Sequence, residues 1–172
     1  GFIFQDPMTS LTPHLKIGDQ LAEIAIYHKK INKNKALKKA IEVMDIVKLP
    51  SNRDIINSYP HELSGGMKQR IMIAISLMCE PDLIIADEPT TALDVTTQAE
   101  ILNIFNDLKN NFNIGLVLIS HNIGVIAETS NEVLVMKDGQ ILESGETAKV
   151  LTKPKNEYTK HLLSCIPPWI GN

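Results

Sequence analysis

The stretch Leu63-Ser64-Gly65-Gly66-Met67-Lys68-Gln69-Arg70 decides the fold class of this 172-residue chain. It sets a Ser-Gly-Gly turn at the start of a predicted helix, and the apolar run Leu83–Ala86 follows, closed by Asp87 and Glu88. Glycines let backbone N–H groups approach a phosphate, and a helix N-terminus adds partial positive charge. A strand that ends in two carboxylates can offer one to a magnesium ion and the other to a water. Together the two stretches indicate a nucleotide-handling α/β protein.

The segment before the carboxylate strand has helical periodicity. After an opening strand and a loop over Asp6–Pro13, apolar spacing predicts a helix from Ile17 to about His28, and Asn32 or Asn34 can cap a second one. Residues 54–63 are expected to be a linker before a third, apolar helix that reaches Cys79. The apolar positions of the second helix are Leu37, Ile41, Met44 and Val47.

From Asp82 onward the pattern alternates between strand and helix. The runs 83–86 and 115–120 lack amphipathic alternation, which predicts parallel strands covered on both faces. Between them lies a long predicted helix over 92–112. A hairpin turning at Asp138-Gly139 and two short helices, 146–151 and 157–166, are expected to follow. The inward-facing residues of the long helix are expected to be Ala99, Leu102, Phe105 and Leu108.

Composition is that of an ordinary globular domain, with 44% hydrophobic and 22% charged residues. The net charge of −3 provides no global attraction to nucleic acid or to a membrane surface. Cys79 and Cys165 lie far apart without a C-x-x-C partner, so a zinc site or disulfide is not expected. No apolar run approaches the roughly 20 residues that span a bilayer. Six lysines in residues 29–39 are read as a solvated face, with a polyanion site as the alternative.

Each candidate functional residue also has a purely structural interpretation. Asp87 and Glu88 could cap a helix after a core strand, and the Ser-Gly-Gly turn could be an ordinary helix start. His121, at the end of an apolar strand, could be a satisfied structural histidine. Asp94 could cap the long helix that follows it, and this role is compatible with a functional one.

Taken with Gln5, Asp94 and His121 at their positions, the two stretches resemble the ATP-binding subunit of an ABC transporter, from the first residue to about Pro167. The resemblance implies an α/β fold: a partial P-loop NTPase (RecA-like) core with a parallel sheet and an inserted helical subdomain. Residues 1–172 would form the C-terminal part of one ATP-binding domain. The helical subdomain would span about 6–80, the catalytic core about 81–145, and C-terminal helices about 146–172.

The resemblance also implies the site. Glu88, His121 and Gln5 would be catalytic, and Asp87 with Gln5 would meet the Mg²⁺ that accompanies ATP. The residues expected to bind nucleotide across a dimer of cassettes are Ser64, Gly65, Gly66, Gln69 and Asp94.

Three stretches, 5–11, 86–95 and 158–163, resemble the bacterial peptide and nickel importer group in particular. Partners would be a second ATP-binding subunit (as a homo- or heterodimer), transmembrane permease subunits and, indirectly, an extracytoplasmic binding protein, with no nucleic acid. The location would be the cytoplasmic face of the cell membrane. Two alternatives stay open: a soluble ABC ATPase without a transport role, and a truncated, non-catalytic interaction module.

One expected motif is missing. The phosphate loop G-x-x-x-x-G-K-[ST] occurs nowhere in the 172 residues, and the chain opens at Gly1 inside a strand-like run. We therefore expect a C-terminal fragment of a longer ATPase, which would not hydrolyse ATP alone.

Overall fold

The computed structural model describes residues 1–6, 10–50, 53–91 and 93–165. The chain divides into two compact units, Gly1–His121 and Asn122–Asn172, which are described separately. Pro7 in the predicted first loop, Ala92 at the predicted start of the long helix, and Ile166 at the predicted end of the last helix lie outside the described residues.

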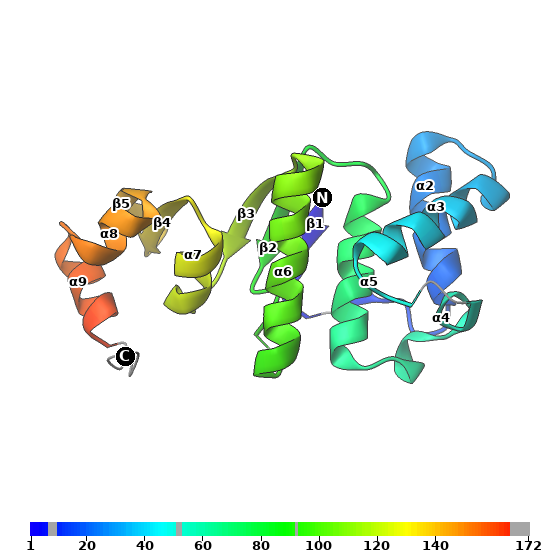
Figure 1. Cartoon of the computed structure of the whole chain (residues 1–172), viewed down its shortest axis with the longest axis horizontal. Coiled ribbons are helices and arrows are strands. Elements are labelled where there is room, and N and C mark those ends of the chain that lie inside the picture. The colour runs from blue at the N-terminus through cyan, green and yellow to red at the C-terminus, as the bar shows by residue number, and fades with distance from the viewer. Residues whose placement is uncertain (7–9, 51–52, 92, 166–172) are drawn as a thin grey trace. The chain divides into compact units, whose positions relative to one another are not determined.

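The first unit contains the predicted helices. They are α2 (Ile17–Lys29), α3 (Lys33–Ile46) and α5 (Gly65–Leu77). In Figure 1 they gather with the short helix α4 (Arg53–Asn57) on one side of the long helix α6 (Val95–Phe112). Asn32 caps α3, because its side chain accepts a hydrogen bond from the backbone N–H of Lys35.

The predicted apolar face of α3 was right for Met44 and Val47 and wrong for the other two positions. Ile41 is exposed and Leu37 is only half-buried, while small and β-branched side chains face the neighbouring helices. Small alanines let α2 and α5 approach α3 closely, so the buried stripe follows packing distance rather than side-chain size. The residues buried along this stripe are Ala36, Ala40, Val43, Met44 and Val47.

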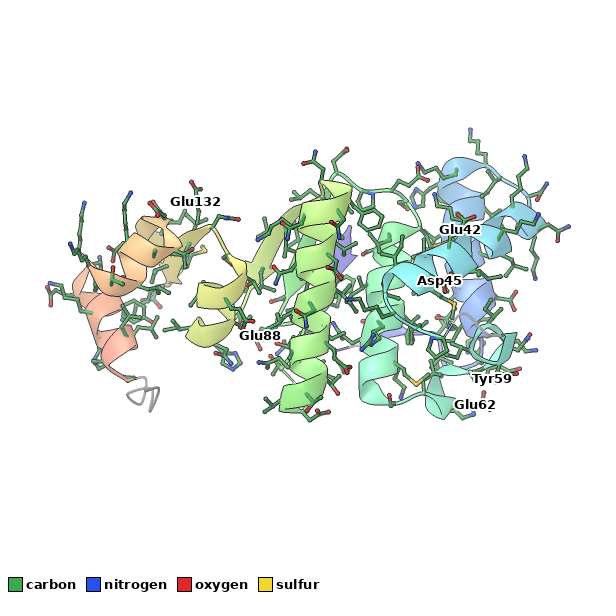
Figure 2. The ribbon with its side chains drawn as sticks, viewed as in Figure 1. Glu42, Asp45, Tyr59, Glu62, Glu88 and Glu132 are labelled. Atoms are coloured by element: carbon green, nitrogen blue, oxygen red, sulfur yellow. The ribbon has the colours of Figure 1, made fainter. Side chains whose placement is uncertain are left out.

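Two further boundaries differ from the prediction. The expected linker contains the short helix α4 (Arg53–Asn57) and a 3₁₀ turn over Pro60–Glu62. The turn is held by a capping box in which the backbone N–H of Tyr59 donates to Glu62 Oε2 at 2.6 Å (Figure 2). Helix α5 ends at Leu77, so Cys79 lies beyond it and is half-buried.

A three-stranded parallel sheet forms the other part of this unit, as predicted. Its strands β1 (Phe2–Ile3), β2 (Leu83–Asp87) and β3 (Gly115–Ile119) lie in that order. Helix α6 (Val95–Phe112) connects β2 to β3, and Figure 1 shows it lying along the sheet. The register pairs Asp87 with Ile119, so the ends of β2 and β3 lie next to each other.

The prediction that the strands are covered on both faces was wrong for the described residues. Ile3, Ile84 and Ala86 are buried on the face beneath α5 and α6. The opposite face is open, with four large side chains between 44% and 48% exposed: Phe2, Leu83, Val117 and Ile119. Helix α6 also packs differently from the expectation, because Ala99 is exposed while Leu102, Phe105 and Leu108 are buried.

The second unit consists of α7 (Ile123–Thr129), β4 (Glu132–Lys137), β5 (Gln140–Glu146), α8 (Thr147–Thr152) and α9 (Glu157–Ser164). The predicted hairpin is present, and Asp138 and Gly139 both have positive φ, of 50° and 76°. This is the conformation that a two-residue turn between twisted strands requires. The Glu143 carboxylate accepts hydrogen bonds from the backbone N–H groups of Lys155 and Asn156, which fixes the turn before α9.

Candidate functional site

Three side chains converge on Glu88 and form, with it, the glutamate cluster (Gln5, Glu88, Thr91 and His121). Gln5 Nε2 donates to Glu88 Oε2 at 3.1 Å, and Thr91 Oγ1 donates to the same oxygen at 2.8 Å. His121 Nδ1 lies 2.8 Å from Glu88 Oε1. Gln5 follows β1, Glu88 follows β2 and His121 follows β3, so the cluster collects residues at the carboxyl ends of all three strands.

The backbone at Glu88 is unusual. Its φ of 44° lies in the left-handed region, which costs a residue with a side chain about 1 kcal/mol or more. The backbone N–H of Glu88 donates to the carbonyl of Ile119 at 2.9 Å, which anchors this conformation to β3. The side chain is thereby directed away from the strand and toward His121. Figure 2 marks Glu88 close to the lower end of α6.

Hydrogen bonding tunes the acidity of Glu88. The bond from His121, followed by that from Thr91, lowers the pKa of Glu88 below its ordinary value, and burial opposes this. The Glu88 side chain is 22% exposed and that of His121 is 70% exposed. The carboxylate is therefore ionised at neutral pH, ready to accept a hydrogen bond from a water or ligand.

Asp87 lies beside the cluster as the last residue of β2 and is half-buried. Among the residues that the structure describes, no hydrogen bond or ion pair occupies its carboxylate. Magnesium in nucleotide sites commonly takes one or two carboxylates and completes its shell with water and phosphate oxygens. Asp87 and the amide oxygen of Gln5 fit that donor set. Within the described part of the chain, no three His, Cys, Asp or Glu side chains form a protein-only metal site.

The Ser64-Gly65-Gly66 turn begins α5 as predicted. Ser64 is the N-cap residue, and its Oγ accepts from the backbone N–H of Met67 at 3.3 Å. A Cβ added at Gly66 would lie 2.5 Å from Thr97 Cγ2, whereas one at Gly65 would meet nothing nearer than Leu93 Cδ2 at 3.9 Å. Gly66 is therefore required for the close approach of α5 to α6. A side chain at Gly65 would have room.

Asp94 caps α6, so the helix-cap interpretation holds for Asp94 and is wrong for Asp87 and Glu88. The Asp94 carboxylate accepts from the backbone N–H of Thr97 at 3.0 Å and from its hydroxyl at 2.7 Å. These bonds, the backbone one first, lower the pKa of Asp94.

Gln69, expected near the turn, lies inside α5 and is 1% exposed. Its side-chain nitrogen has no hydrogen-bond partner within the described segments.

The structure thus gathers the predicted residues into two groups. Gln5, Glu88 and His121 meet, and Asp94 meets the Ser64-Gly65-Gly66 turn, which we call the signature turn, through Thr97. No side-chain hydrogen bond among the described residues joins one group to the other. Sequence reasoning missed Thr91 and Thr97. Thr91 stands three residues after Glu88, and Thr97 stands three after Asp94, a spacing at which each hydroxyl bonds back to the earlier carboxylate.

No helix in the described part of the chain is long and apolar enough to cross a bilayer.

Comparison with known proteins places this geometry in a family. The sequence pattern of the ABC transporter family matches residues 1–91. "Oligopeptide transport ATP-binding protein OppD" of Salmonella typhimurium is 47% identical over 167 residues, which are 97% of this chain and 50% of that protein. "Oligopeptide transport ATP-binding protein AppD" of Bacillus subtilis is 48% identical over 167 residues, 97% of this chain and 51% of its own length. The chain spans about half the length of these curated relatives.

Solved structures agree. The dimeric ATP-binding cassette MJ0796 in a post-hydrolysis state with ADP and Pi superposes with a TM-score of 0.74 at 28% identity, over 86% of this chain and 62% of that one. The cbiO1 component of a Clostridium perfringens ABC transporter gives 0.77 at 25% identity, over 89% and 59%. The expected α/β fold class, a partial P-loop NTPase core with a parallel sheet, is confirmed by these neighbours and by the sheet itself. A match over more than half of the chain, close relatives throughout its length and the cassette fold establish that this chain belongs to the ABC transporter family.

Proposed function

We propose that the protein to which this chain belongs is the ATP-binding subunit of a bacterial ABC importer, coupling ATP hydrolysis to the uptake of peptides, or of nickel or a related small solute. The observation that carries the proposal is the glutamate cluster, in which residues from the ends of three parallel strands surround one ionised carboxylate. The names of the relatives support peptides as the solute class.

Glu88 is proposed to orient the attacking water and accept its proton. The carboxylate oxygens already accept hydrogen bonds from Gln5, Thr91 and His121, and a water could replace the longest of these, at 3.1 Å from Gln5. His121 Nδ1 donates to Glu88, since an ionised carboxylate only accepts, and this leaves Nε2 to face a ligand. Donation from Nε2 to a terminal phosphate would then require the protonated imidazolium.

ATP and Mg²⁺ are the proposed cofactors. Asp87 and Gln5 would hold the magnesium ion, which would neutralise charge on the phosphate oxygens. The lowered pKa of Glu88 suits a group that must stay ionised beside them. The left-handed backbone at Glu88 would keep its carboxylate at the carboxyl ends of the strands, where the phosphates are proposed to lie.

The signature turn is proposed to bind the terminal phosphate of ATP held by a second ATP-binding subunit. Ser64 Oγ and the backbone N–H groups of Gly65 and Gly66 would be the donors, supported by Gln69, and Asp94 would set the geometry across the dimer interface. The exposure of Ser64, Gly65 and Asp94 is consistent with this role. Permease subunits, and through them an extracytoplasmic binding protein, would be further partners. The protein would then lie at the cytoplasmic face of the membrane.

The phosphate loop is proposed to lie outside these 172 residues. The open face of the sheet supports this, because large apolar side chains such as Val117 and Ile119 are usually covered in a parallel sheet. The chain alone would then be inactive. If the protein has no phosphate loop elsewhere, the second candidate is a non-catalytic module that pairs with complete cassettes through its signature turn.

The test is Glu88→Gln in the full-length protein. We expect ATP turnover to fall by about 100-fold or more while ATP-dependent dimers persist, because the amide removes the proton acceptor and keeps the shape of the side chain. Glu23→Gln, on the exposed side of α2, is the control and should turn over normally. Turnover by Glu88→Gln at the parental rate would refute the assigned role.

A further inference from the structure

The basic residues of this chain are concentrated in one short segment. Residues 29–39 hold six of the 17 basic residues and none of the 20 acidic ones. The other 161 residues hold 11 basic and 20 acidic residues, so this segment is a local positive region on a chain of net charge −3. It covers the end of α2, the turn after it and the first half of α3.

The folded chain turns this segment into a concave surface, the lysine pocket. Its volume is about 490 Å³. Half-buried Ile31 contributes apolar surface to its wall. The charged side chains that line it are Lys29, Lys35, Lys38, Lys39, Glu42 and Glu80.

One side of the lysine pocket already holds an anionic group. Glu80, in the turn after α5, pairs with Lys29 at 2.8 Å and also with Lys39. These two lysines, Lys29 first, lower the pKa of Glu80 to about 2. Lys39 is 17% exposed and Lys29 is 37% exposed, so their stems lie against the protein and their ammonium groups are held in position. The two ammonium groups are therefore arranged around a single carboxylate.

The other side of the lysine pocket carries Lys35, Lys38 and the Glu42 carboxylate. Within the described residues Lys35 and Lys38 make no ion pair, although Lys38 and Glu42 are one turn apart on α3. In Figure 2 Glu42 projects from α3 near its middle. Exposed pairs between lysine and carboxylate contribute little to stability, so a ligand of higher charge can compete with them.

We propose that the lysine pocket binds the phosphate groups of a multiply charged anion, with Lys35 and Lys38 as the exposed ligands and Lys29 and Lys39 as the positioned ones. Ammonium groups bind phosphate as point charges and do not require a planar fork, so four lysines on two helices suit a flexible chain of phosphates. Two sources share this chemistry: a soluble polyphosphate, and the headgroups of an anionic phospholipid surface. The proposal does not depend on the glutamate cluster or on the proposed ATPase activity.

The experiment compares variants of the full-length protein in two binding assays. Inorganic tripolyphosphate is titrated by calorimetry, and sedimentation measures binding to vesicles of phosphatidylglycerol and phosphatidylcholine in equal amounts. A phosphate loop elsewhere in the protein would also bind tripolyphosphate. Binding at the lysine pocket is therefore measured as the difference between variants rather than as the total signal. Lys35→Glu with Lys38→Glu should weaken binding by roughly tenfold or more in at least one assay. Lys153→Glu with Lys155→Glu, in the second unit, makes the same change of charge and should leave binding unchanged.

Glu42→Gln is expected to change anion binding in the opposite direction. It removes a negative charge from the pocket without breaking an ion pair within the described residues, so it should strengthen binding in the assay that the lysine variant weakens. A loss confined to tripolyphosphate identifies a soluble ligand, and a loss confined to vesicles identifies a lipid surface; both support the proposal. Equal binding by the parent, the lysine variant and Glu42→Gln in both assays would overturn it, provided thermal denaturation confirms that all are folded.

Discussion

Glu88 combines three properties that rarely coincide in a structural residue: a left-handed backbone, hydrogen bonds from three side chains, and a lowered pKa. Strain of this kind persists only where the surroundings hold it in place. Here the bond from the Glu88 N–H to the Ile119 carbonyl does so. The neighbouring Asp87 has an ordinary strand conformation, and its carboxylate is available. Adjacent acids thus have different environments and different proposed roles.

Thr91 is expected to tune Glu88. Its hydroxyl donates to the ionised carboxylate, and removing this donor in Thr91→Val should raise the pKa of Glu88 toward its ordinary value, because the charged form loses a stabilising bond. A pH titration followed by the chemical shift of the Glu88 carboxyl carbon measures the change. Thr91→Ser retains the hydroxyl and should titrate close to the parent. If Thr91→Val titrates like the parent, the hydroxyl does not bond Glu88 in solution.

At the scale of elements, the contact between α5 and α6 depends on Gly66. Thr97 cannot rotate away freely, since its hydroxyl is bound to Asp94 at 2.7 Å. Gly66 in the first turn of α5 and Thr97 in the first turn of α6 therefore lie against each other. This contact orients the signature turn relative to Asp94. This arrangement would explain how one surface can present both groups to a second subunit.

Gly66→Ala should destabilise the protein by about 1–3 kcal/mol, because the added Cβ would lie 2.5 Å from Thr97 Cγ2. Chemical denaturation measures the change in the free energy of unfolding. Gly65→Ala is the matched control and should change this energy by less than about 1 kcal/mol, since its Cβ has room. Adding Thr97→Ser, which lacks Cγ2 and keeps the hydroxyl, should restore most of the unfolding free energy that Gly66→Ala loses. No rescue would mean that another contact causes the loss.

Arg70 connects three helices. Its guanidinium donates to the carbonyls of Val47 and Lys48 at the end of α3 and to Glu100 Oε2 on α6, and its side chain is 12% exposed. Arg70→Met should cost about 2–3 kcal/mol of unfolding free energy, since it leaves partly buried carbonyls without donors. Glu100→Gln removes only the exposed partner and should cost less than about 1 kcal/mol. Equal costs in thermal denaturation would assign the effect to the ion pair alone.

For the whole chain, the two groups of candidate site residues lie in the first unit. This unit contains the carboxylates and the signature turn. A phosphate loop of the form G-x-x-x-x-G-K-[ST] is not in the sequence. In P-loop proteins the backbone N–H groups and the lysine of that loop hold the phosphates of ATP.

Calorimetric titration of the 172-residue chain with Mg-ATP should therefore give no detectable binding. The full-length protein is the positive control if it contains the loop. Circular dichroism must first confirm that the isolated chain is folded, because the open sheet face carries Phe2, Leu83, Val117 and Ile119. Tight binding by the folded chain would show that the phosphates lie elsewhere than proposed.

Local chemistry in the sequence was sufficient for much of this protein. The turn before α5, a cap at Asn32 or Asn34, the cap at Asp94 and the Asp-Gly hairpin were predicted, since each depends on residues close in the chain. The parallel strands were predicted from their apolar runs and from the helix between β2 and β3. The structure brings Gln5, Glu88 and His121, which were selected through the resemblance to a family, into hydrogen-bond contact. Their catalytic roles stay predictions.

Tertiary structure decided the remainder, because it depends on what each residue packs against. The buried stripe of α3 follows its alanines rather than Ile41, since neighbouring helices approach closely there. The strands were expected to be covered on both faces, but packing covers one. Thr91 and Thr97 became partners of Glu88 and Asp94 only through the turns that bring them back, and the lysine pocket exists only because Glu80 folds against α2 and α3.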